Sequence, residues 1–109
     1  MKPRFTVCWH PAVTDDLARM WISSLRREAI TSAWNQAEQA LASNPAAAGL
    51  ELAADQIDAD AFRILMQRVV PTQGSGPLRV LAVEPLEVCF SVREEDLVVT
   101  VWMIRQESR

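Results

Sequence analysis

The chain has 109 residues, of which half are hydrophobic and 23% are charged, and this composition is typical of a single soluble globular domain. A chain of this length can bury a hydrophobic core without disulfides or bound metal. The formal net charge of −3 argues against a dedicated nucleic-acid-binding protein, because such proteins bind mainly by neutralising phosphates.

The N-terminus lacks the apolar segment of a signal peptide, and no apolar run is long enough to cross a bilayer. We therefore expect a cytoplasmic protein that does not contact membranes. Two cysteines, Cys8 and Cys89, are too few for a disulfide framework and are interpreted as buried thiols. A zinc site built from them and His10 would lack a fourth ligand, so we expect no metal and no cofactor.

The N-terminal part predicts a strand followed by a helix. Apolar and polar residues alternate over residues 3–10, which indicates a half-buried strand. Pro11 cannot donate a backbone hydrogen bond and ends this strand. Thr14 has the chemistry of an N-cap, so the first helix is predicted over residues 15–25. Its apolar face would consist of Leu17, Met20, Trp21 and Leu25.

A second helix is predicted over residues 28–43. It ends at Asn44-Pro45, because a residue that precedes proline avoids the helical conformation. Residues 45–49 are interpreted as a linker. Two helices with a short connection form an antiparallel hairpin, and their apolar faces need a sheet to cover them.

The C-terminal part predicts three strands, over residues 79–83, 86–92 and 97–104. The turn at Glu84-Pro85 joins the first two strands. The last strand is apolar at nearly every position, which is typical of a strand that is buried on both faces. The predicted fold is therefore α+β, with a two-helix hairpin on one face of a four- or five-stranded twisted antiparallel sheet. Six side chains are expected to be almost fully buried in it: Trp21, Trp34, Leu41, Val88, Phe90 and Val101.

Residues 62–70 are ambiguous. Ile64, Val69 and Val70 favour a strand, and we expect a strand that forms a long hairpin with the strand at residues 79–83. The alternative is a short third helix capped by Asp58 or Asp60.

Several motifs occur in an order that resembles the RelE/ParE toxin superfamily. They are Trp9-His10-Pro11, Asp16-Leu17-Ala18-Arg19-Met20-Trp21, the segment 41–45 that ends in proline, Arg79-Val80-Leu81, Pro85-Leu86, and Phe90-Ser91-Val92 before an acidic turn. The resemblance covers roughly residues 4–49 and 78–104. It implies one toxin-like domain over residues 1–109, with an insertion at 50–77.

The resemblance also implies a function in a type II toxin–antitoxin system, as in plasmid-stabilisation toxins. Members either cleave messenger RNA on the ribosome or inhibit DNA gyrase, and a small cognate antitoxin neutralises them. The position that usually carries a catalytic arginine is Glu87 here, and the chain has no tyrosine. Only Arg79, Arg105 and Arg109 could supply cations. The expectation is therefore a toxin that binds a protein target and is not an efficient ribonuclease.

The expected partner surface lies on the last strand. Trp102 and Ile104, flanked by Arg79 and Arg105, would bind an acidic, amphipathic antitoxin segment or a second copy of the chain. Trp102 marks such a surface only if that side of the sheet is open. The other three tryptophans are predicted to lie in the core. The alternative function is a non-toxic descendant that serves as a protein-binding or oligomerisation module.

Overall fold

A mixed five-stranded sheet forms the centre of the molecule. The computed structural model describes residues 4–51, 59–68 and 77–106. In chain order the elements are β1 (Thr6–Trp9), α1 (Pro11–Ser23), α2 (Arg27–Ser43), α3 (Pro45–Ala48), β2 (Leu50–Glu51), α4 (Ala59–Arg68), β3 (Arg79–Val83), β4 (Leu86–Arg93) and β5 (Val98–Gln106).

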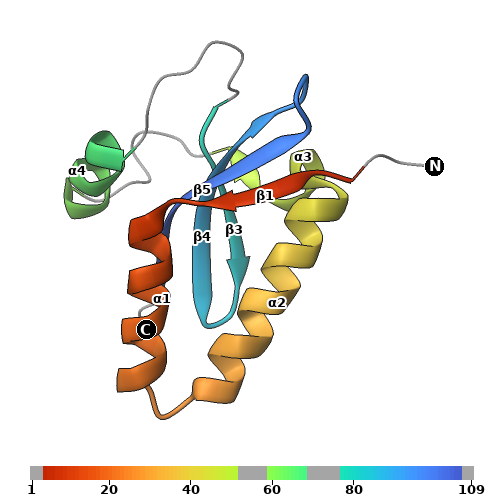
Figure 1. Ribbon diagram of the computed structural model, residues 1–109. Coiled ribbons are helices and arrows are strands. Elements are labelled where there is room, and N and C mark those ends of the chain that lie inside the picture. The colour runs from red at the N-terminus through yellow and green to blue at the C-terminus, as the bar shows by residue number, and fades with distance from the viewer. Residues whose placement is uncertain (1–3, 52–58, 69–76, 107–109) are drawn as a thin grey trace.

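The strand order in the sheet is β1-β5-β4-β3-β2 (Figure 1). Strands β3, β4 and β5 follow one another through short turns and are therefore antiparallel, as predicted. Strand β1 runs parallel to β5, so the sheet is mixed rather than wholly antiparallel. No tight turn joins β1 to β5, and the direction of β1 is consequently set by packing rather than by a hairpin.

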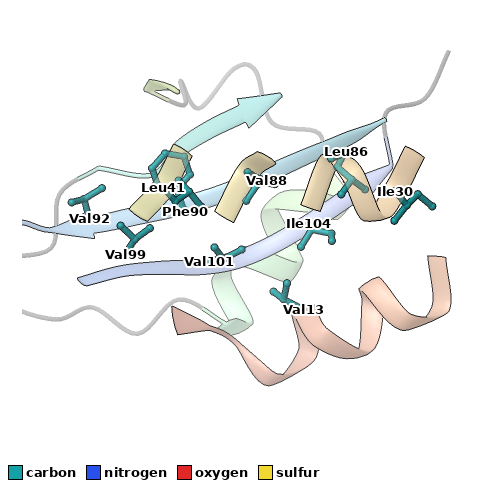
Figure 2. Close-up of a cluster of buried hydrophobic side chains, with 12 residues drawn as sticks. Val13, Ile30, Leu41, Leu86, Val88, Phe90, Val92, Val99, Val101 and Ile104 are labelled. Carbon is teal, nitrogen blue, oxygen red and sulfur yellow. The ribbon is translucent and has the colours of Figure 1, made fainter. Parts of the chain in front are cut away.

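The predicted α+β class and the helical hairpin on the sheet are confirmed. Helices α1 and α2 lie side by side on one face of the sheet, and their inward side chains meet those of β4 and β5 (Figures 1 and 2). Four of the six side chains predicted to be almost fully buried are completely inaccessible, namely Leu41, Val88, Phe90 and Val101. No helix in the described ranges is long and apolar enough to cross a membrane.

Helix α1 begins four residues earlier than predicted. The Nδ1 atom of His10 accepts a hydrogen bond from the backbone N–H of Ala12 at 3.1 Å, so His10 and not Thr14 is the N-cap. The inward face of the helix starts at the fully buried Val13. It continues at Leu17 and Met20, which contact the core at helical spacing.

The prediction of a buried Trp21 is wrong. Its side chain is 44% exposed. Trp21 follows Met20 directly, and one residue of an α-helix turns the side chain by about 100°, which carries Trp21 off the inward face. Trp34 and Trp9 are half-buried and stack with their ring centroids 3.7 Å apart at the edge of the core.

The segment predicted as a strand contains helix α4. Residues 59–68 include the strong helix formers Ala59, Leu65 and Met66, whereas the β-branched pair Val69-Val70 that favoured a strand lies outside the described residues. The alternative of a short third helix is therefore correct. Residues 45–48, interpreted as linker, form the single turn α3.

Helix α4 covers the second face of the sheet. Leu65 is 2% exposed and belongs to a separate cluster with Cys89, Trp102 and Met103. In Figure 2 this helix lies behind the sheet, opposite α1 and α2. Strand β5 is thus covered on both faces, as its nearly continuous apolar sequence predicts.

Candidate functional site

The expectation that Trp102 is an exposed partner-binding residue is wrong. Trp102 is only 9% exposed, and its indole N–H donates a hydrogen bond to Ser91 Oγ at 2.9 Å. A β-bulge places it there. Cys89 pairs with Met103 while Phe90 pairs with Val101, which leaves Trp102 as the extra residue of β5. Trp102 and Met103 therefore both face the α4 side.

The four residues predicted for one partner surface are divided between two faces. Ile104 is 3% exposed and belongs to the core beneath the helical hairpin. Arg79 pairs with Phe90 in the register of β3 and β4, so it also faces the hairpin, and its Nη2 donates to the carbonyl oxygen of Gly49 at 2.6 Å. Arg105 pairs with Glu87 and faces the opposite side.

Of the two candidate arginines in the described ranges, Arg79 and Arg105, only Arg105 faces the α4 side, and a carboxylate lies beside it. Its Nη2 lies 3.2 Å from Oε2 of Glu87, the residue at the position where the resemblance expects a cation. Arg105 also lines a shallow groove of about 390 Å³ between α1, α4 and β5. Asp16 and Asp60 lie in the same groove, which makes it a poor site for a phosphate group. Arg109 lies outside the described residues.

Arg68 connects α4 to the rest of the molecule. Its Nη1 donates to the carbonyl oxygen of Trp102 at 3.2 Å, and its Nη2 lies 3.0 Å from Oδ2 of Asp16. The bulge disrupts the ladder at Trp102, so the guanidinium group satisfies a carbonyl that the ladder leaves available. Nothing in the sequence pattern singles out Arg68, because its partners are far away along the chain.

His10 serves as a helix cap, which accounts for its Nδ1 atom without a catalytic role. Within residues 4–51, 59–68 and 77–106, no group of three His, Cys, Asp or Glu side chains is arranged to hold a metal ion. Cys89 is buried as expected, whereas Cys8 is exposed, contrary to expectation.

The two thiols should differ sharply in reactivity. Burial raises the pKa of the Cys89 thiol from 9.0 to about 12, although the nearby Arg105 lowers it somewhat. Because the thiolate is the reactive species, iodoacetamide at pH 8 should modify Cys8 alone in the folded protein. Intact-mass measurement should show one added group, and a second only after denaturation in urea. Rapid modification of Cys89 in the folded protein would show that α4 does not cover it.

Helices α1 and α2 meet at an end that we call the hairpin tip, residues 19–28. Three large apolar side chains are exposed there: Trp21, Ile22 and Leu25. The Cζ atom of Arg27 lies 4.7 Å from the centroid of the Trp21 ring. The sequence pattern placed Trp21 and Leu25 on an inward helix face, whereas α1 packs on the core through Val13, Leu17 and Met20.

Two solved structures match the fold over its full length. The toxin–antitoxin complex RelBE2 of Mycobacterium tuberculosis has a chain that matches with a TM-score of 0.66 and 12% identity, over 100% of this chain and 98% of that one. The archaeal RelE–RelB complex of Pyrococcus horikoshii gives a TM-score of 0.62 and 15% identity, over 100% and 99% of the two chains. No protein-family model and no curated protein matches this chain.

The class that these observations define is an α+β protein with the RelE-like fold. The first of the two structures is a toxin–antitoxin complex, and the second is a RelE–RelB complex. At identities of 12% and 15%, the similarity establishes the architecture of this chain and does not establish its activity.

Proposed function

We propose that the protein is the toxin-like component of a toxin–antitoxin pair and that it acts by binding a protein target. The observation that carries the first part is the fold match, which extends over nearly the whole of both chains. A small cognate antitoxin is then the expected partner.

Binding is favoured over messenger-RNA cleavage by the charges around Arg105. Cleavage of a phosphodiester requires a group that activates the 2′-hydroxyl and cations that stabilise the developing phosphate charge. Here Glu87 lies 3.2 Å from Arg105, and Asp16 and Asp60 line the adjoining groove. Arg79 faces the other side of the sheet and cannot cooperate with Arg105 at one phosphate. A target of the gyrase type needs a surface and no catalytic set.

Expression of the protein alone from an inducible promoter should arrest growth. If a small reading frame next to its gene encodes the antitoxin, co-expression of that frame should restore growth, because the antitoxin would cover the active surface. A translation reaction with purified ribosomes should show no site-specific messenger cleavage, whereas a DNA gyrase supercoiling reaction should be inhibited. The variant Phe90→Ala, which removes a fully buried core side chain, is the control with a destabilised fold.

Two results would change this assignment. Normal growth at full expression would favour the non-toxic binding or oligomerisation module. Specific messenger cleavage that disappears in Arg105→Ala would establish a ribosome-dependent endonuclease. Arg105 is the better test position, because Arg79 hydrogen-bonds the backbone of Gly49 and its loss would also disturb the fold.

A further inference from the structure

The hairpin tip exposes a group of apolar side chains that the core does not use. Trp21 is 44% exposed, Ile22 is 67% exposed, and Leu25 is fully exposed. These residues lie within the last turn of α1 and the connection to α2, at the end of the hairpin in Figure 1. Single exposed apolar residues are common, but three within five positions indicate a contact surface.

The tryptophan of this surface is held in place. Arg27 donates from Nε to the carbonyl oxygen of Trp21 at 2.9 Å and from Nη2 to that of Ile22 at 3.0 Å. The same guanidinium group lies over the Trp21 ring. Arg27 thereby satisfies two of the free carbonyls at the end of α1 and fixes the indole ring. Because the Trp21 ring is already fixed, binding of a partner here costs little side-chain entropy at the tip.

The tip is basic although the chain as a whole is acidic. Residues 19–28 contain three arginines, Arg19, Arg26 and Arg27, and one glutamate, whereas the chain carries a net charge of −3. The guanidinium groups of Arg19 and Arg26 are exposed and pair with no residue in the described ranges. They are therefore available to carboxylates of another molecule.

A polar groove adjoins the apolar group. It has a volume of about 520 Å³ and is lined by Trp21 and Arg27 and by further residues of α2. Its α2 side chains follow helical spacing. Beside the charged Arg27 and Glu28, they are uncharged hydrogen-bonding groups, namely Thr31, Ser32, Asn35, Gln36 and Gln39.

We propose that the hairpin tip binds an acidic, amphipathic helix of a partner protein, with the apolar stripe of that helix against Trp21, Ile22 and Leu25. The flanking carboxylates pair with Arg19 and Arg26, and polar side chains contact the groove. A symmetric contact between two copies is disfavoured because it would bring the arginines of both tips together. The proposal concerns a surface and stands independently of whether the protein is toxic.

The test measures binding of the intact protein to a fluorescently labelled synthetic helix that carries a leucine stripe flanked by glutamates. Fluorescence anisotropy should show saturable binding that weakens as salt is added, because exposed charge pairs are screened. The double variant Arg19→Glu/Arg26→Glu should bind at least about tenfold more weakly, a loss of about 1.4 kcal/mol. Leu25→Ser should also weaken binding, and since Leu25 is fully exposed the fold is retained.

The matched control is Arg63→Glu, which changes an exposed arginine on α4 away from the tip and should leave binding unchanged. A peptide with lysines in place of the glutamates should not bind. The proposal is overturned if the acidic helix fails to bind, if it binds the tip variants as well as the unmodified protein, or if the tip variants instead lose binding to anionic vesicles or to an RNA oligonucleotide. Self-association that Leu25→Ser abolishes would also overturn it in favour of a second copy.

Discussion

Replacement of Phe90 by alanine should lower the free energy of unfolding by about 3–5 kcal/mol, the usual cost of removing a large aromatic side chain from a core. Phe90 is completely buried on β4. Figure 2 shows its ring on the side of the sheet where Leu41 of α2 and Val88 lie. The side chain thus joins the helical hairpin to the sheet, and its loss leaves a cavity between the two layers.

Urea unfolding followed by tryptophan fluorescence measures this loss. Trp21→Ala is a useful control, because it also removes a large aromatic side chain but from a position that is 44% exposed. We expect Trp21→Ala to cost about 1 kcal/mol, because it removes mainly the contact between the indole ring and the guanidinium group of Arg27. Equal costs for the two variants would contradict the assignment of Phe90 to the core and Trp21 to the surface.

Replacement of Gly49 by alanine should also destabilise the protein, by about 1–3 kcal/mol or more, the range for overpacked sites. The backbone at Gly49 is extended and would accept any residue, so the cost is steric. A Cβ atom there would collide with the carbonyl oxygen of Val80 and lie 2.9 Å from its carbonyl carbon. It would also lie 3.2 Å from Cε1 of Phe90.

The carbonyl of Val80 cannot easily move away. Val80 pairs with Leu50 of β2 on one side and with Cys89 of β4 on the other, so a shift would disturb both ladders. Leu50→Ala, at a neighbouring residue that is 80% exposed, should change stability by only about 0.5 kcal/mol. Urea midpoints of the two variants make the comparison. A Gly49→Ala variant as stable as Leu50→Ala would show that β2 does not pack against β3 as described.

The core prediction bears on function as well. A destabilised fold lowers every activity, so Phe90→Ala separates loss of fold from loss of a surface. The tip variants, in contrast, change exposed side chains and leave the core intact. Growth arrest that survives Arg19→Glu/Arg26→Glu would indicate that the proposed toxin function uses another surface, while the peptide measurement would still decide the proposal about the tip.

The periodicity of the sequence determined the order and type of most elements. Alternation over 86–92 predicted β4, although Cys89 and Ser91 on its second face are also buried. Apolar spacing over 28–43 predicted α2, because this helix buries one stripe of side chains and the pattern records it. The short link at Glu84-Pro85 left an antiparallel hairpin as the one simple pairing of β3 and β4. The family resemblance, together with this order, led to the fold that the solved complexes share.

The candidate site depended on features that leave no local pattern. The bulge at Trp102 moves Met103 to the α4 side, and a bulge is a property of two paired strands that neither strand reveals alone. The inward face of α1 runs through Val13, Leu17 and Met20 and leaves Trp21 off it, and only the packing of the helix on the sheet fixes which stripe faces inward. The interpretation of 50–77 as an insertion stays a prediction, and residues 52–58 and 69–76 lie outside the described ranges.

What the sequence determined by itself was which residues are apolar, at what period, and in what order. Only the tertiary structure decided which side of the sheet each one faces and what covers that side. An apolar face beneath α4 and an apolar face open to a partner have the same sequence pattern, because both exclude water at the same positions. For this reason Trp102 looked like a binding residue and is core, while Trp21 looked like core and lies at the surface.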